Sequence, residues 1–308
     1  MRTQNRSNAM IYALLVLRSV IYGSTYLFTG RLLQSMDVLD LLSLRFLLSS
    51  LLFLFFVAVG VLKVDLRGKD LRLLAVASLF EPVLSFVFET LGVAGTNSMT
   101  AGLLSAFSPA VVIVLETIFL RERTTHLQKL MVLVSITGVL LISVVGSAGS
   151  GTNTLGGVLA MMLCLLTSGL FLICSRHSSQ SFTAVEITFF TTLMGGGIFN
   201  TVNLGRHLVK GDIAGYFLPL KEPSVLLSLL FLSGMASLVG AMINNFGLAK
   251  LQASRVVALN GVSPMTSVAL GVLINHEAFR WYHAVGGILV LIGATGINLL
   301  AQKKVDKA

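Results

Sequence analysis

The sequence predicts an all-α integral membrane protein. Of its 308 residues, 55% are hydrophobic and only 11% are charged, whereas soluble domains average about 25% charged residues. The apolar residues also gather in windows of roughly 20, the length of helix that crosses a hydrocarbon core about 30 Å thick. A soluble protein of this size would need more charge on its surface. The bilayer is therefore the solvent that fits this composition.

Ten apolar windows follow one another along the chain, five in each half, and each is a predicted transmembrane helix. The windows are residues 9–33, 39–62, 71–91, 98–120, 128–147, 155–175, 183–204, 225–246, 253–274 and 281–301. An uncharged, flexible stretch of mainly Gly, Ser and Thr at 146–154 joins the two halves. We therefore expect two domains, 1–147 and 148–308.

The connections support these boundaries and set an orientation. The longest connection, residues 205–224, contains two Gly and two Pro residues and has the length for an amphipathic surface helix. Fifteen Lys and Arg residues lie on the side of the two termini and five on the opposite side. Because cytoplasmic loops are enriched in Lys and Arg, we expect a multi-pass protein of the cell inner (plasma) membrane with both termini in the cytoplasm. The same topology explains the net charge of +9, so we expect no nucleic-acid partner.

The two halves match each other at a constant shift of about 155 positions. Several special residues recur at this shift: Gly92 and Gly247, Ser108-Pro109 and Ser263-Pro264, Glu122 and Glu277, and Gly138 and Gly293. Because each half has an odd number of helices, the second half must enter the membrane in the opposite direction. We expect two inverted-topology five-helix repeats around a central cavity, an architecture that many secondary transporters share.

These residues resemble the drug/metabolite transporter superfamily, in particular its EamA-type ten-helix transporters. The resemblance covers nearly the whole chain and is carried by Leu44-Arg45-Phe46, Ala101 to Pro109, Phe119-Leu120-Arg121-Glu122-Arg123-Thr124 with Gly138, and the second copy in Ser263-Pro264, Asn275-His276-Glu277, Gly286-Gly287 and Gly293. It implies a basket of ten helices, a cavity open to one side at a time and, in many members, export of amino acids or other metabolites. The sequence departs from the pattern at Thr188, which stands in the place of Arg45 in the second half.

Polar stripes on two predicted helices give candidate substrate-binding residues. An ionisable residue within a span costs about 2.5 to 3.5 kcal/mol and by default marks a partner or a pathway. Residues at helical spacing share one face. The stripes are Arg18, Tyr22, Thr25 and Thr29 on the first helix, and Ser78, Glu81, Ser85 and Glu89 on the third. Arg18 and Glu81 lie at similar depth, so we expect them to pair across the cavity; a pair that only fixes helix register is the alternative.

The repeat adds further candidates. Ser105 matches Asn260, and Glu89 matches Asn244, so polar groups are expected at equivalent places in both halves. Pro109 and Pro264 are candidate hinges, with ordinary packed kinks as the alternative. Glu186, near the start of the seventh predicted helix, is expected to be a solvated helix end, with a gate formed with Arg176 as the alternative.

We expect a secondary-active or facilitative transporter that exports a small polar or zwitterionic metabolite, such as an amino acid, by alternating access. Arg18 would match a substrate carboxylate, and Glu81 or Glu89 an amine or a proton. One alternative is efflux of amphipathic cations or drugs along the aromatic side chains Tyr22, Tyr26, Phe86 and Phe88. A second is a non-transporting membrane sensor or assembly subunit. The sequence has no Ser-His or His-rich metal arrangement and no phosphate-binding loop, so we expect no enzyme, no metal and no cofactor. Proton coupling and a homodimer stay open.

Overall fold

The computed structural model describes residues 2–119, 124–150, 153–243 and 259–305, and within these ranges it contains helices and turns but no β-strand. The predicted all-α class is thus confirmed for the described residues. The elements, in which η marks a π- or 3₁₀-helical segment, are α1 (Arg2–Leu32), α2 (Val38–Ala58), α3 (Arg72–Ser78), η1 (Leu79–Leu84), α4 (Ser85–Gly95), α5 (Ser98–Ser105), α6 (Ser108–Phe119), α7 (His126–Ser150), α8 (Leu155–Ser178), α9 (Ala184–Lys210), α10 (Ile213–Phe217), η2 (Leu218–Lys221), α11 (Pro223–Leu230), η3 (Phe231–Gly240), η4 (Leu259–Gly261), α14 (Val262–Leu273) and α15 (Trp281–Val305).

Eight stretches of the described residues are long and apolar enough to cross a membrane, and each overlaps one predicted window. They are Met10–Leu32, Val38–Ala58, Arg72–Gly95, Ser98–Phe119, His126–Gly146, Leu155–Ser175, Pro223–Ile243 and Trp281–Leu300. The other two windows correspond to α9, whose 27 residues are less apolar, and to α14, which has 12 residues. The start of the window at 253–274 lies outside the described residues.

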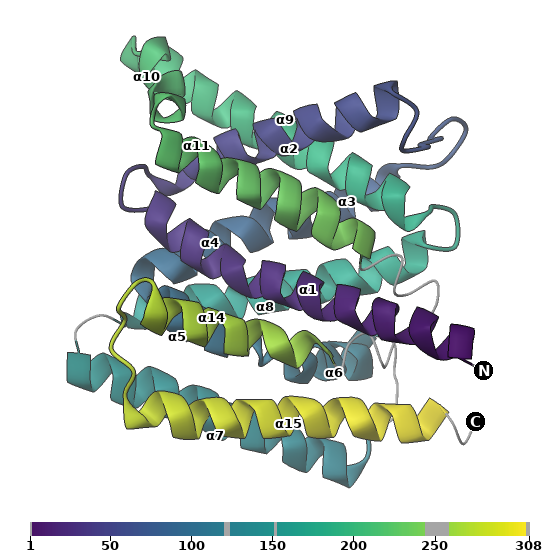
Figure 1. Ribbon diagram of the computed structural model, residues 1–308, viewed down its shortest axis with the longest axis vertical. Helices are drawn as coiled ribbons and strands as arrows, with labels where there is room; N and C mark the ends of the chain where they lie inside the picture. The colour runs from purple at the N-terminus through teal and green to yellow at the C-terminus, as the bar shows by residue number, and fades with distance from the viewer. Residues whose placement is uncertain (1, 120–123, 151–152, 244–258, 306–308) are drawn as a thin grey trace.

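The long helices lie side by side, so that their connections gather at the two ends of the bundle (Figure 1). The start of α1 and the end of α15 lie at one end, together with the α2–α3 and α8–α9 connections; we name this the terminal end. The α1–α2 and α14–α15 connections lie at the opposite end beside α10, and we name this the α10 end. The connection between residues 205 and 224, for which the sequence left room for a surface helix, contains α10 and η2.

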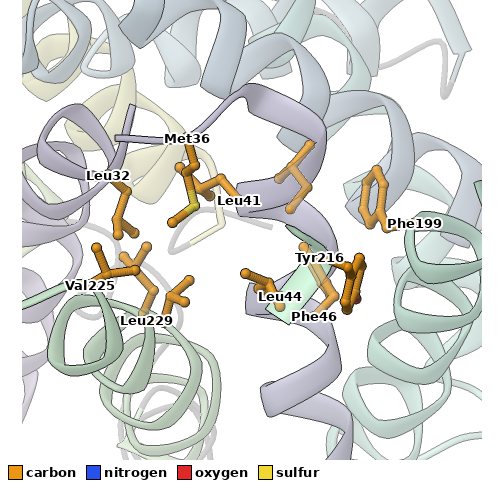
Figure 2. Packing of buried hydrophobic residues seen from close by; sticks show 11 residues of the cluster. Leu32, Met36, Leu41, Leu44, Phe46, Phe199, Tyr216, Val225 and Leu229 are labelled. Carbon is orange, nitrogen blue, oxygen red and sulfur yellow. The ribbon is translucent and has the colours of Figure 1, made fainter. Parts of the chain in front are cut away.

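A buried apolar cluster surrounds α2 near the α10 end (Figure 2). Its members come from α1, the α1–α2 connection, α2, α9, α10, α11 and η3 and comprise Leu32, Met36, Leu41, Leu42, Leu44, Phe46, Phe199, Tyr216, Val225, Leu229 and Leu232. Tyr216 also donates a hydrogen bond to Asn200 Oδ1 of α9. Because Leu44 and Phe46 are both fixed in this cluster, the rotation of α2 is fixed, and with it the direction of Arg45 between them.

The outer faces of α7 and α15 carry exposed apolar side chains at helical spacing. On α7 these are Leu130, Leu133, Leu140 and Val144, and on α15 they are Val285, Ile288, Ile292 and Leu299. A helix in water would place polar residues on such a face, whereas a lipid-facing helix does not. These faces therefore fit contact with the hydrocarbon core.

The inner faces of α7 and α15 meet through glycines. A Cβ atom on Gly138 would lie 2.6 Å from the Gly286 carbonyl oxygen, and one on Gly293 would lie 2.5 Å from that of Met131. Ser135 Oγ donates to Val290 O at 3.4 Å. As the residue numbers fall along α7 they rise along α15, so the two helices are antiparallel. Small residues permit this close approach between membrane helices.

Two predicted helices are interrupted within the described residues, and the described part of a third begins with a 3₁₀ segment. In η1, Glu81 has an extended backbone (φ −141°, ψ 120°) between helical neighbours. Between α5 and α6 the chain turns at residues 106 and 107, and α14 follows the short 3₁₀ segment η4. Pro109 and Pro264 lie in the first turns of α6 and α14, where a missing N–H leaves no helical bond unmade. The turn at residues 106 and 107 and the 3₁₀ segment η4 therefore precede these prolines, and whether the prolines act as hinges stays a prediction.

Ion pairs tie α9 to α2 and its flanking loops at both ends. At the terminal end, Lys69 Nζ lies 2.7 Å from Glu186 Oε2, and the backbone N–H of Asp65 donates to Glu186 Oε1 at 3.1 Å. Glu186 is only 4% exposed, so the expectation of a solvated helix end is wrong. The reason is that the loop after α2 folds over the start of α9, which local sequence does not reveal.

At the α10 end, two carboxylates of the α2 start meet two basic side chains of the α9 end. Arg206 lies 2.6 Å from Asp37 Oδ2 and 2.7 Å from Asp40 Oδ1. His207 Nε2 lies 3.0 Å from Asp40 Oδ1, and Asn203 Nδ2 donates to the same oxygen at 2.9 Å. We name these five residues the α10-end clamp.

Candidate functional site

Four ionisable side chains from α1, α2, η1 and α4 lie within the membrane-spanning part of the bundle. Arg18 is 3% and Arg45 is 4% exposed, while Glu81 and Glu89 are partly buried. We name Arg18, Arg45, Glu81 and Glu89 the central charge cluster. Four such groups inside a membrane protein are costly unless a cavity, partner or pathway uses them.

Tyr22 links the α1 stripe to Glu81. The guanidinium carbon of Arg18 lies 5.3 Å from the centre of the Tyr22 ring, and Tyr22 interacts electrostatically with both Arg18 and Glu81. The ring is close to η3, because a Cβ on Gly240 would lie 2.6 Å from Tyr22 Cε1. Thr25 Oγ1 donates to the Tyr22 carbonyl at 2.6 Å. Arg18 and Glu81 thus border the same tyrosine, while their direct pairing stays a prediction.

Glu81 lies at the helix interruption of η1. Pro82 has no N–H. Its ring packs against Gly195 of α9, so closely that a Cβ atom added to Gly195 would lie only 2.4 Å from Pro82 Cγ. Ser168 of α8 hydrogen-bonds to Glu81, and Glu89 interacts with it electrostatically. Interrupted membrane helices are a common way to bring polar groups to a transport site. The sequence predicted the stripe but not this interruption.

Arg45 and Glu89 form the part of the cluster nearer the α10 end. The two side chains interact electrostatically. The Arg45 guanidinium carbon lies 4.6 Å from the centre of the Phe86 ring and 5.9 Å from that of Phe46, which are cation–π distances. The Arg45 carbonyl accepts a hydrogen bond from Ser233 Oγ at 2.9 Å, so η3 also fixes this turn of α2.

The remaining predicted site residues are placed as follows. Ser85 is buried on the same segment as Glu89. Ser105 Oγ donates to Gly102 O at 2.7 Å and also interacts with Tyr26, which in turn interacts with Glu89. Asn244 and the side chain of Asn260 lie outside the described residues. The structure therefore brings together Tyr22, Tyr26, Ser105 and the four charges, and it leaves the second-half asparagines untested.

Sequence reasoning missed Arg45, Ser168 and Cys164. Arg45 carried a usable signal, because it is as much an ionisable residue within a span as Arg18 is. It was used only as part of the Leu44-Arg45-Phe46 motif. Cys164 of α8 interacts electrostatically with Glu81 and Glu89 and forms a hydrogen bond with Ser168. No sequence signal marks this face of α8. Within the described residues, no group of three or more potential metal-ligating side chains lies together.

Comparisons with known proteins agree with this architecture. The profile described as the EamA-like transporter family matches residues 9–144 and again residues 155–299. The chain is similar to the "Uncharacterized transporter YcxC" of Bacillus subtilis (strain 168), with 30% identity over 96% of this chain and 95% of that protein. It is similar to the "Uncharacterized transporter YetK" of the same organism at 26% identity, over 96% and 88% of the two chains. One solved crystal structure superposes with a TM-score of 0.62 at 16% identity, covering 94% of this chain and 97% of that one.

Proposed function

Because the chain belongs to the EamA-like transporter family, we propose that it exports a small polar or zwitterionic metabolite, such as an amino acid, by alternating access. Membrane transport by a multi-pass helical protein is the function of the family. The substrate class, the direction and the mechanism are our proposal. The central charge cluster is the single observation that carries it.

The composition of the cluster favours a substrate that bears both charges. Arg18 and Arg45 can bind a carboxylate, and Glu81 and Glu89 can bind an ammonium group. Because the two signs balance, a zwitterion can enter without leaving net charge in the low-dielectric interior, where uncompensated charge is expensive. A substrate with one charge would leave part of the cluster without a counter-ion.

We further propose ten membrane helices arranged as two inverted repeats, 1–147 and 148–308. Three observations support this. The bounds of α7 and α15 differ by 155 at both ends, η1 shifted by 155 falls within η3, and the family profile matches twice. The antiparallel contact of α7 and α15, which are equivalent at that shift, is what an inverted repeat requires.

The same architecture would place both termini on one side of the membrane. The start of α1 and the end of α15 lie at the terminal end (Figure 1), the side to which the sequence assigns most Lys and Arg residues. We propose that the terminal end faces the cytoplasm and that the protein resides in the inner (plasma) membrane. Lys63 and Lys221 lie in connections at opposite ends of the bundle. Replacing each with cysteine and measuring which one an impermeant thiol reagent labels from outside the cell tests this orientation.

Coupling to protons is also a proposal, and it rests on the proximity of Glu81 to Glu89. Two ionised carboxylates that lie close together repel each other, so uptake of one proton can accompany one half of the transport cycle. An imposed pH gradient across proteoliposomes should then drive accumulation of substrate. Exchange that an imposed gradient does not alter would leave facilitated exchange as the mechanism.

Efflux of amphipathic cations is the weaker alternative. Phe86, one of the aromatic side chains expected to receive a cation, has Arg45 over its ring at 4.6 Å. A second cation would meet both the occupied ring face and the charge of Arg45. The geometry therefore favours a substrate with an anionic group.

Counterflow in proteoliposomes tests the proposed function. Purified protein would be loaded with pools of unlabelled L-amino acids, and entry of each radiolabelled amino acid would be followed, with protein-free liposomes as the control. We expect at least one zwitterionic amino acid to exchange and a permanent cation such as ethidium to fail. Exchange of the cation without exchange of any amino acid would contradict the proposal.

A further inference from the structure

We propose that Arg45 and Glu89 hold the two ends of the substrate, with its carboxylate on Arg45 and its ammonium group on Glu89. This inference rests on the proposed function and assigns binding groups within it. It differs from the expectation drawn from the sequence, in which Arg18 was the carboxylate partner.

The guanidinium of Arg45 has unmet hydrogen-bonding capacity. Its Nε is buried without a hydrogen-bond partner, and no group among the described residues hydrogen-bonds to any nitrogen of this guanidinium. An arginine has five N–H donors, and a buried charged donor without a partner is strongly unfavourable. A ligand carboxylate supplies two acceptor oxygens in the planar geometry that a guanidinium matches.

Arg45 and Glu89 lie near each other without forming a direct ion pair. These two side chains interact electrostatically, yet they form no direct ion pair, so their charged atoms lie beyond the ion-pair distance of about 4 Å. The Glu89 carboxylate likewise accepts no hydrogen bond from the described residues. Each group therefore lies near the opposite charge without contacting it, and an α-amino acid carries its ammonium and carboxylate groups on the same carbon.

The side chains of Arg45 and Glu89 are held by the packing of α2 and α4. Phe86 precedes Glu89 by three residues, so the two side chains share one face of α4. The Phe86 ring lies under the Arg45 guanidinium and packs edge-on against Phe46, with the ring centres 5.1 Å apart. Phe46 and Leu44 are held in the buried cluster of Figure 2. Arg45 is therefore oriented before a ligand arrives, which reduces the entropy lost on binding.

Arg18 is differently placed. Its guanidinium lies over Tyr22 on its own helix, one turn away and nearer the terminal end. Arg18 is thus suited to the path that the substrate takes from the terminal end, whereas Arg45 faces the acidic side chain that completes a zwitterion site.

The test is a comparison of charge-specific binding defects in the full-length protein. Thermal stabilisation in detergent would be measured with each common L-amino acid. The one that gives the largest shift would then be compared with its decarboxylated amine and its deaminated acid. The variants are Arg45→Gln and Glu89→Gln, with the exposed residues Arg280→Gln and Glu222→Gln as matched controls.

We expect Arg45→Gln to weaken amino-acid binding at least about tenfold while leaving the affinity for the amine within about twofold. We expect Glu89→Gln to weaken amino-acid binding similarly while preserving the affinity for the deaminated acid. A general folding defect would weaken every ligand alike and therefore cannot imitate this pattern. The two control variants should bind all three ligands as the natural protein does.

Three results would overturn the inference. If both cluster variants bind the amino acid normally, the site lies elsewhere, although transport of amino acids would stand. If each variant loses the amine and the acid equally, Arg45 and Glu89 do not divide the two charges between them. If the natural protein neither binds nor exchanges any amino acid, the proposed function itself fails, and the inference fails with it.

Discussion

Lys69, Arg206 and His207, at the two ends of the α2–α9 pair, each lie within 3.0 Å of a carboxylate oxygen. Arg45, midway along α2, has no carboxylate at ion-pair distance among the described residues. The end charges stabilise the bundle because their partners are built into it. Within the central charge cluster, Arg45 and Glu89 have hydrogen-bonding capacity that the described protein groups do not use, and this is the capacity that we propose a ligand uses. The comparison predicts opposite consequences for removing charge from the two regions.

The largest expected effect is on transport, from the central charges. Arg45→Gln or Glu89→Gln should reduce the rate of amino-acid counterflow at least about 100-fold, because each variant removes one of two charge-assisted contacts in a desolvated site. The melting temperature should change little or rise, since no direct ion pair is broken. Counterflow and thermal unfolding measured on the same preparation would check both parts. A variant that melts far below the natural protein yet transports normally would reverse the comparison.

A large effect on stability is expected at the terminal end. Lys69→Ala leaves the buried carboxylate of Glu186 without its cation and should reduce the free energy of unfolding by about 1 to 3 kcal/mol. The KM for substrate should stay within about twofold, because the contact lies far from the central charge cluster. Lys63→Ala, an exposed lysine of the same loop, is the matched control and should change neither quantity. Equal effects of the two variants would show that the Lys69–Glu186 pair does not contribute to stability.

A smaller and pH-dependent effect is expected in the α10-end clamp. His207 Nδ1 lies 2.9 Å from the Asp212 carbonyl and Nε2 lies 3.0 Å from Asp40 Oδ1. Both partners are acceptors, so both ring nitrogens donate and the imidazolium form is favoured. The hydrogen bond to Asp40 accordingly raises the pKa of His207 above its ordinary value of 6.5.

A raised pKa in the folded state means that this contribution to stability is fully present below pH 6.5 and is lost as the pH rises through the folded-state value. The melting temperature of the natural protein should therefore fall between about pH 6 and pH 8. The His207→Gln variant should show a flatter profile, with a difference of about 1 kcal/mol or less. Identical profiles for the two proteins would mean that His207 does not carry the proton.

The smallest effect is expected from Asp37, whose side chain is 54% exposed. Its carboxylate pairs with Arg206 and also caps the start of α2 by accepting from the N–H groups of Leu39 and Asp40. Asp37→Asn retains an oxygen for the cap and should reduce the free energy of unfolding by at most about 0.5 kcal/mol, while Asp37→Ala loses the cap as well and should cost about 1 kcal/mol. Chemical unfolding of both variants measures the difference. If both substitutions destabilise equally, the ion pair and not the cap is the important contact.

Much of the fold was predictable because apolar windows of span length report directly on helices in a membrane. The predicted window at 128–147 became α7, and the window at 281–301 became α15. The polar stripe with Glu81 and Glu89 was also predictable, since helical spacing alone places those residues on one face. These inferences need only local sequence.

The parts that failed or were missed depend on contacts between distant segments. Glu186 is buried because Lys69, 117 positions earlier, folds over it. The interruption at Glu81 places Pro82 against Gly195 of α9, and no local pattern reveals that contact. Arg45 was recognisable as an intramembrane charge, but its relation to Glu89 required the packing of α2 against α4. The polarity of α9 is explained in the same way, because its Asn200 and Asn203 face groups of α2.

The most direct test of a substrate site that opens to water at the central charge cluster uses the natural thiol Cys164, which interacts electrostatically with Glu81 and Glu89. Cys164 is 6% exposed in this structure, so a charged reagent reaches it only when the transport cycle opens the site. In a Cys174→Ser background, its modification by a charged methanethiosulfonate reagent would be timed with and without the transported amino acid. The matched control is Cys174 in a Cys164→Ser background. We predict that the reagent modifies Cys164 and that substrate slows this reaction several-fold, with no effect of substrate on Cys174. A Cys164 that never reacts, or reacts at a rate that substrate does not change, would contradict the account.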